Sequence, residues 1–360
     1  MTETHHDHTV LREVSANPAR DPFLDFAKGV LILLVTWGHA IQYITYWNTD
    51  FWEDPVFKCL YMFHMPLFMG ISGYLSYGGI QRKPFRLLIP EKFRAYMLPV
   101  LVWAVIGECL RCIIFKDSLF IELPLRVLRA APNGLWFLWC LFACIVFIAL
   151  VRCIRYRFGL ITCITALLII LTPEKSSLYF LKFMLPYFLA GYWIADRRWL
   201  LLRKQTLVAL FICSFLMSVT CFLYWHEDSY IYSTKMVLTR ANLPNIGLRY
   251  LAGLCASIVT LIVLNVFYTK TPDFLRKAFA RLGRDSLYIY ILQIFAFTWI
   301  LDASKVVSLP LHAQPAGAPL ALVASVILVT LFLFVGGLIA RQPLFGFLLF
   351  GKKLVVQSKS

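Results

Sequence analysis

Charged residues are scarce in this sequence, and acidic residues are the scarcer kind. Only 15% of the 360 residues are Asp, Glu, Lys or Arg, whereas 60% are hydrophobic and the mean hydropathy is +0.73. A soluble domain needs a charged surface, and this composition supplies too few polar side chains to cover one. It therefore excludes an ordinary soluble globular protein and predicts a chain that crosses a membrane several times.

The sequence also lacks the spacing of a metal site or a disulfide framework. Of its ten cysteines only Cys109 and Cys112 form a C-x-x-C pair, and no second pair or histidine follows at ligand spacing. The cysteines are therefore predicted to be small core residues, and no metal site is expected. Residues 1–20 are polar, contain His5, His6 and His8, and have no apolar core of a signal peptide. We expect a solvated cytoplasmic tail there.

Long apolar runs recur along the rest of the chain, and we interpret each as a membrane-spanning helix. The ten runs are 23–47, 56–78, 95–115, 134–151, 158–172, 178–195, 205–225, 245–268, 285–301 and 318–340. No long linker or internal repeat separates them. The predicted fold is one all-α integral membrane domain over residues 21–341, followed by a basic cytoplasmic tail over 342–360.

The Lys and Arg residues indicate the orientation of these spans. With the amino terminus in the cytoplasm, 23 of the 35 Lys and Arg residues fall on inside segments and 7 on outside segments. Cytoplasmic loops carry such an excess of positive charge, so both termini are predicted to be cytoplasmic. The net charge of +16 then follows from the topology, and no nucleic-acid partner is needed to explain it.

The first run carries polar residues that a lipid-facing helix would avoid: Asp25, Lys28, Thr36, His39 and Gln42. Lys28 and His39 are eleven residues apart, which places them within about 20° of each other on a helix and about 16 Å apart along its axis. The five residues form one polar stripe, which should face protein or water. Ionisable groups inside a membrane favour a functional interpretation. The alternative is that His39 only bonds a neighbouring helix and Lys28 extends to the interface.

A second polar position is His64, within FHMPLFMGISGYL, at a depth similar to that of His39. Pro66 interrupts the helix hydrogen bonds there, and Gly70 and Gly73 would permit close approach of another helix, so this segment could border a cavity. A packed, kinked helix with a satisfied histidine is the alternative. A basic cluster follows at the predicted cytoplasmic face, at Arg82, Lys83, Arg86, Lys92 and Arg94. Topology alone explains that cluster, but it could also bind the phosphates of a long substrate that reaches His39.

Five motifs together resemble those of the membrane-bound acyltransferase-3 family, especially its sugar O-acetylase branch. They are DFAKGVLILLVTWGHA, FHMPLFMGISGYL, KFRAYMLP, NGLWFL and GRDSLYIYILQIF. The resemblance implies ten core helices and transfer of an acyl group, usually acetyl from cytosolic acetyl-CoA, to a hydroxyl of an extracytoplasmic glycan or its lipid-linked precursor. Two positions depart from the usual pattern. Lys28 stands where Arg is common, and Gln293 stands where the ninth-helix motif often has His.

These observations give the following hypothesis for catalysis. His39, as a neutral imidazole, is the general base that acts on the acceptor hydroxyl, and His64 supports the site. Lys28, Lys92 and Arg94 hold phosphates of CoA. No signature of a Ser or Cys nucleophile is evident, so direct transfer is expected. Acetyl-CoA is a co-substrate, and no permanently bound cofactor is expected.

Further residues are predicted on the substrate side. Asp25 is expected to pair with Lys28 at i, i+3, and the substrate-side candidates are Asp25, Gln42, Trp136 and Gln293. The expected partners are the lipid bilayer of the bacterial cytoplasmic membrane, acetyl-CoA and a glycan or lipid-linked sugar. The oligomeric state is left open. Two alternatives remain: a transporter or flippase for an anionic or lipid-linked sugar, and an acyltransferase with a non-sugar acceptor.

Overall fold

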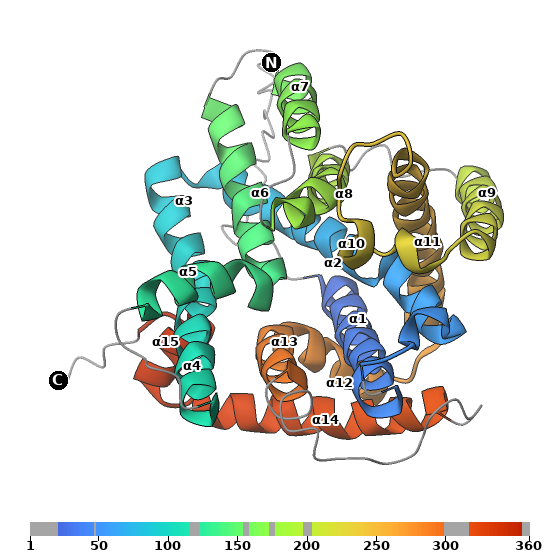
Figure 1. The fold of residues 1–360 in the computed structure, drawn as a ribbon. Coiled ribbons are helices and arrows are strands. Elements are labelled where there is room, and N and C mark those ends of the chain that lie inside the picture. The colour runs from blue at the N-terminus through green and yellow to red at the C-terminus, as the bar shows by residue number, and fades with distance from the viewer. Residues whose placement is uncertain are drawn as a thin grey trace, which may run out of the picture.

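The computed structural model describes residues 21–46, 48–115, 122–153, 158–172, 177–196, 204–298 and 317–354. All regular elements in these ranges are helices, and the ranges contain no β-strand. The predicted amino-terminal tail and the ends of the first and ninth runs and of the carboxy-terminal tail lie outside the described residues. The described part of the chain is thus entirely α-helical (Figure 1).

Each of the ten predicted runs corresponds to a helix. They are α1 (Pro22–Ala40, continued by the π-helical turn η1, Ile41–Thr45), α2 (Pro55–Arg82), α4 (Leu98–Phe115), α6 (Trp136–Cys153), α7 (Phe158–Leu171), α8 (Leu178–Asp196), α9 (Lys204–Leu223), α11 (Leu243–Lys270), α13 (Ser286–Phe295) and α14 (Gly317–Ile339). Among the described residues, seven helices are long and apolar enough to cross a membrane, and two shorter apolar helices coincide with α7 and α13. The protein is an all-α, multi-pass membrane protein.

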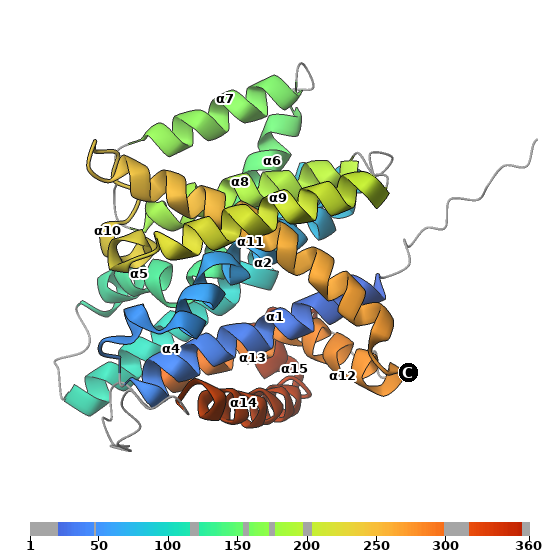
Figure 2. The ribbon, with the colours of Figure 1, turned by 90° about the vertical axis from the view of Figure 1, so that its right-hand side faces the viewer.

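Shorter helices lie at the two ends of this bundle. They are η2 (Phe51–Glu53), α3 (Phe85–Lys92) with the π-helical turn η3 (Phe93–Met97), α5 (Leu123–Gly134), η5 (Glu227–Ser229), α10 (Ile231–Thr234), α12 (Asp273–Arg284) and α15 (Pro343–Phe350). Figure 2 shows α5 and α10 at one end of the long helices and α12 at the opposite end. We call these ends the α10 end and the α12 end.

The first two long helices begin in the same way. Each has Asp at the residue before the helix and Pro at its first position: Asp21 before α1 and Asp54 before α2. The Asp21 carboxylate accepts a hydrogen bond from the backbone N–H of Phe23 at 2.9 Å, and Asp54 accepts one from that of Phe57 at 2.8 Å. These caps satisfy amide groups that have no partner inside the helix, and proline is preorganised for a first turn. The sequence therefore determines where both helices start.

Glycine residues set how closely the helices pack. A Cβ atom on Gly29 of α1 would lie 1.9 Å from a backbone oxygen of α12, and one on Gly283 of α12 would lie 1.8 Å from a backbone oxygen of α1. The α2 and α8 helices meet in the same way, at Gly73 and Gly191. The predicted close approach at Gly73 is confirmed. Small residues let helix backbones touch in a membrane protein, so α1 is held directly against α12, and α2 against α8.

Candidate active site

The polar stripe of α1 faces other helices, as predicted. Asp25 and Thr36 are buried, and the Thr36 hydroxyl lies 2.5 Å from the side-chain oxygen of Gln293 on α13. Lys28 forms the predicted ion pair with Asp25, at 3.8 Å. The stripe therefore lies along a surface where α1 contacts other helices of the bundle.

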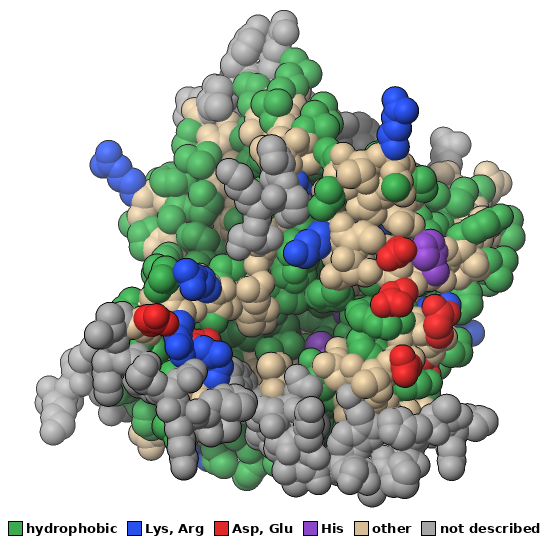
Figure 3. All heavy atoms as spheres, in the orientation of Figure 1, with side chains coloured by type: hydrophobic (Ala, Val, Ile, Leu, Met, Phe, Trp, Pro, Cys, Tyr) green, Lys and Arg blue, Asp and Glu red, His purple; other side chains and the backbone are tan. Residues whose placement is uncertain are grey.

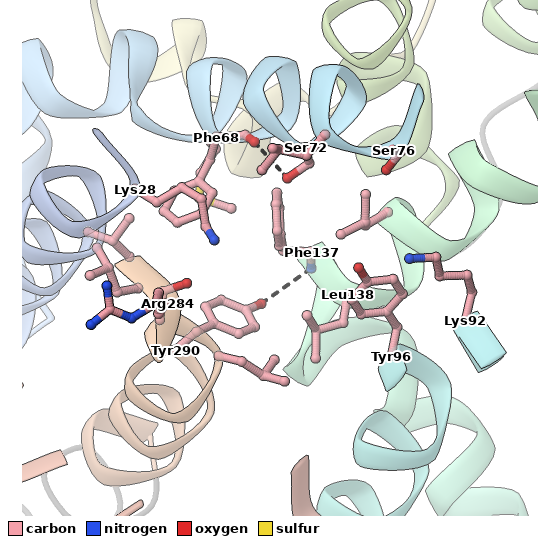
Figure 4. A pocket seen from close by; sticks show the side chains of 17 residues that line it. Lys28, Phe68, Ser72, Ser76, Lys92, Tyr96, Phe137, Leu138, Arg284 and Tyr290 are labelled. Carbon is pink, nitrogen blue, oxygen red and sulfur yellow. Dashed lines mark hydrogen bonds between the residues drawn. The ribbon is translucent and has the colours of Figure 1, made fainter. Parts of the chain in front are cut away.

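A cavity of about 310 Å³ opens beside this stripe and is bordered by α1, α2, α3, η3, α6, α12 and α13. Its polar lining residues are Lys28, Ser72, Ser76, Lys92, Tyr96, Arg284, Ser286 and Tyr290. In Figure 4, Lys28 and Lys92 extend toward the cavity from opposite walls. Three cations from three different helices thus surround one space, and such an arrangement suits a ligand with several anionic groups.

The structure separates the predicted donor-binding residues. Lys28 and Lys92 line the cavity, whereas Arg94 is not among its lining residues. The buried Nε of Arg94 has no hydrogen-bond partner among the described residues. Arg284, the last residue of α12, completes the trio of cations. Arg284 was not among the predicted site residues, although it belongs to the GRDSLYIYILQIF motif, because a basic residue on a predicted cytoplasmic loop is also explained by topology.

Neither candidate histidine lines the cavity, but residues near both of them do. Val35 and Met65 line it. Val35 is one helical turn before His39, and Met65 follows His64 directly. Gly38, the residue before His39, lies against the ring of Tyr61, whose centroid is 4.7 Å from that of the His64 ring. Hence the cavity leads from the cations of the α12 end to the level of the histidine pair.

The two histidines differ in how their rings are held. Nδ1 of His64 lies 2.6 Å from the backbone oxygen of Leu60. A carbonyl oxygen can only accept, so Nδ1 carries the proton and Nε2 of His64 is a hydrogen-bond acceptor. The ring of His39 is partly exposed and hydrogen-bonds the side chain of Gln42, and its buried Nδ1 has no partner within the described chain. Each ring therefore has one nitrogen that can accept a hydrogen bond.

Aromatic rings surround the histidines toward the α10 end. His39 packs beside Tyr43 and Phe297, with ring centroids 6.2 and 5.8 Å away, and the Tyr61 ring lies 4.7 Å from that of His64. Figure 3 views the α10 end, and a histidine side chain is visible within the hollow at its centre. Access to the histidine region thus exists from this end as well as through the cavity.

The remaining substrate-side candidates lie at different places. Trp136, at the start of α6, stacks on Phe180 with ring centroids 4.4 Å apart, and Phe180 in turn lies 5.8 Å from Tyr232 of α10. Trp136 therefore belongs to the aromatic group of the α10 end. Gln293 is fully buried against Thr36 and does not line the cavity. Its amide nitrogen has no partner among the described residues.

The cysteines and other metal-ligating residues form no centre in the described part of the chain. No group of three His, Cys, Asp or Glu side chains is positioned there to hold a metal ion. All ten cysteines are free thiols. Only half of them are buried, so the prediction that they are core residues holds for these alone. The exposed ones lie on helices whose outer surface would face lipid.

Comparison with known proteins identifies the family. The acyltransferase-3 family model, described as "Acyltransferase domain", matches residues 21–342. The chain belongs to the acyltransferase-3 family. It is 31% identical over 289 residues to the nodulation protein NolL of Mesorhizobium japonicum, an alignment that covers 76% of each chain. It is also 31% identical over 296 residues to the nodulation protein NolL of Sinorhizobium fredii, covering 79% of this chain and 80% of that protein. No solved structure matches the chain. As a member of the acyltransferase-3 family, the protein is an O-acyltransferase of the membrane.

Proposed function

We propose that this acyltransferase moves an acetyl group from acetyl-CoA to a hydroxyl of a cell-surface or lipid-linked glycan. One observation supports the proposal above others: the cavity lined by Lys28, Lys92 and Arg284 reaches Val35, one helical turn from His39, and Met65, the neighbour of His64. A long anionic donor can place its phosphates on the cations and its thioester near the imidazoles. The opposite, aromatic approach from the α10 end leaves room for a second substrate.

Lys28, Lys92 and Arg284 would act on the donor through charge. Lys28 is held by Asp25, so part of its position is set before the ligand arrives. Arg284 can bind a phosphate with two parallel N–H groups, whereas the two lysines act as point charges. Binding should weaken as the salt concentration rises, because contacts near the α12 end are partly screened by solvent.

In the transfer step, the neutral His39 takes the proton of the acceptor hydroxyl while its oxygen attacks the thioester carbonyl. The carbon–sulfur bond then breaks, and the CoA thiolate leaves and recovers the proton from the imidazolium. The new bond is an oxygen ester, and the imidazole ends neutral. His64, whose Nε2 can accept a hydrogen bond, would orient the acceptor from the facing helix through a second, neighbouring hydroxyl.

The charge pattern supports an orientation for this reaction. The α12 end carries most of the basic residues, so we place it in the cytoplasm, where acetyl-CoA is available. The α10 end would then face outward from the bacterial cytoplasmic membrane. With this orientation the donor and the acceptor approach the histidine pair from opposite sides of the membrane.

The deciding experiment is mass spectrometry of surface glycans from cells with and without the gene. We expect a shift of one acetyl group that is restored by the wild-type gene and not by His39→Ala. Calorimetry with purified protein should in parallel show CoA binding that weakens with salt. An unchanged glycan mass together with no CoA binding at low salt would refute the proposal. A flippase would instead change the amount of surface glycan and leave its acetylation unaltered.

A further inference from the structure

A second cavity, of about 620 Å³, lies at the α12 end. Its lining includes Gln81, Arg82, Lys83, Phe85, Leu88 and Arg152. None of these residues lines the first cavity, which is about half as large. Two cavities of this size, both rich in cations, therefore open in the same region of the molecule.

The two cavities are bordered by the same three helices, α2, α3 and α6. The α2 helix gives Ser76 to the first and Ile80 to the second, one helical turn apart. The α6 helix gives Leu141 to the first and Ala149 to the second, about 12 Å farther along its axis. The α3 helix borders both, since Leu88 lines the second. One ligand can thus extend from the first cavity into the second without leaving the space between these helices.

Order along α2 places the second cavity farther from the histidines. His64 comes first, Met65 and Ser76 line the first cavity, and Arg82 lines the second. A linear ligand whose reactive end lies at His64 would therefore have its opposite end beside Arg82. The first cavity alone, about 310 Å³, is near the lower limit of roughly 300–1,000 Å³ for drug-sized ligands, and is too small for a nucleotide and its long arm together.

The second cavity combines positive charge with apolar surface. Arg82, Lys83 and Arg152 border it, and Lys83 also pairs with Glu91 of α3. Arg152 donates hydrogen bonds to the backbone oxygens of Ile80 and Gln81, the latter at 2.7 Å, so its position is fixed at the end of α2. Arg152 forms no ion pair among the described residues, and carbonyl oxygens do not neutralise its charge. A phosphorylated nucleotide, with anionic groups and a flat base, fits this chemistry.

We infer that the second cavity binds the nucleotide end of the acyl donor, and that the first cavity holds the inner phosphates and the arm that carries the thioester. This inference depends on the proposed use of a CoA thioester. Lys28, Lys92 and Arg284 would then contact the inner phosphates and the arm, whereas Arg82 and Arg152 would contact the outer nucleotide.

Calorimetry with CoA and with S-acetylpantetheine tests which part of the donor each cavity binds. Arg82→Gln should weaken CoA binding about tenfold, as expected for one lost, partly screened phosphate contact, and should leave S-acetylpantetheine binding unchanged because that probe lacks the nucleotide. Arg341→Gln is the matched control, since Arg341 is an exposed arginine after α14 that lines neither cavity. It should change CoA binding less than twofold.

Cys153 offers a second measurement that needs no substitution. It is exposed and lines the second cavity, whereas the exposed Cys59, near the start of α2, lines neither cavity. CoA should slow maleimide labelling of Cys153 and leave Cys59 unaffected, and S-acetylpantetheine should protect neither. The inference is overturned if Arg82→Gln weakens both probes equally or neither, or if CoA does not protect Cys153. If the wild-type protein binds neither probe, the proposed function itself fails.

Discussion

Replacement of Arg249 by Met should loosen the α10 end while leaving the donor side intact. Arg249 lies on α11 and is only 1% exposed. Its guanidinium donates hydrogen bonds to the backbone oxygens of Asp228, Ser229 and Tyr230 at 2.7, 2.6 and 3.0 Å, and also to the Lys235 oxygen. One side chain therefore holds the whole segment from η5 to the end of α10.

The magnitude follows from these contacts. Methionine fills a similar volume but donates no hydrogen bond, so at least three carbonyl groups lose a donor. Each buried unsatisfied group costs about 1–3 kcal/mol, and some will reach water at the surface, so we expect a total of about 3–5 kcal/mol. Because the segment can detach without unfolding the helices, most of this cost should appear as local opening.

Hydrogen exchange measured by mass spectrometry in detergent gives the direct assay. In Arg249→Met the amides of residues 228–236 should exchange at least tenfold faster, while those of α1 and α12 stay protected. The ring centroid of Tyr232 lies 6.5 Å from that of Tyr61, and the Tyr61 ring contacts His64. Loosening this segment should therefore raise the KM for the acceptor and leave the affinity for CoA unchanged. The exposed Arg240, replaced in the same way, is the control. Unaltered exchange at residues 228–236 in Arg249→Met would refute the reasoning.

Three further predictions concern the histidines, Lys28 and the packing of α12 against α1. His39→Ala should lower turnover by roughly 10² to 10⁴ without affecting CoA affinity, whereas His64→Ala should give a smaller loss and less folded protein; equal losses in stable protein would show that the two histidines act as a pair. Lys28→Arg should retain most transfer activity, and Lys28→Ala should weaken CoA binding in calorimetry by about tenfold; equal activity of the two variants would remove Lys28 from the donor site. In Gly283→Val the new Cβ atom would lie 1.8 Å from a backbone oxygen of α1, so the two helices must move apart. The free energy of unfolding, measured by thermal unfolding, should fall by about 1–3 kcal/mol. Gly337→Val, with open space around it, should be neutral; equal loss of stability in both would contradict the packing argument.

The sequence by itself determines the local features of this protein. Apolar runs predict where the helices lie, since a helix in lipid must be apolar along its length. The stripe with Lys28 and His39 follows from helical periodicity, and the pairing of Asp25 with Lys28 follows from their spacing of three residues. The resemblance to the acyltransferase-3 family also rests on motifs within single helices.

Only the tertiary structure decided which helices contribute to the cavity. Arg284 joins Lys28 because α12 crosses α1 where Gly29 and Gly283 allow the backbones to touch, a contact between residues more than 250 positions apart. The same packing buries Gln293 against α1 and keeps it out of the cavity. Such contacts depend on which helix faces which, and that information is absent from the periodicity of any one segment.

Lys92 and Arg94 show that the sequence could not predict which of two nearby basic residues lines the cavity. The two residues are neighbours in a basic motif, and the sequence gives no reason to separate them. Residues two positions apart point to nearly opposite sides of a helix, so only one of the pair can face a given space. The packing of α3 and η3 against α6 places Lys92 on the cavity and directs Arg94 elsewhere. The sequence therefore determined that a basic pair is present, and the rotation of one helix against its neighbours decided which member lines the cavity.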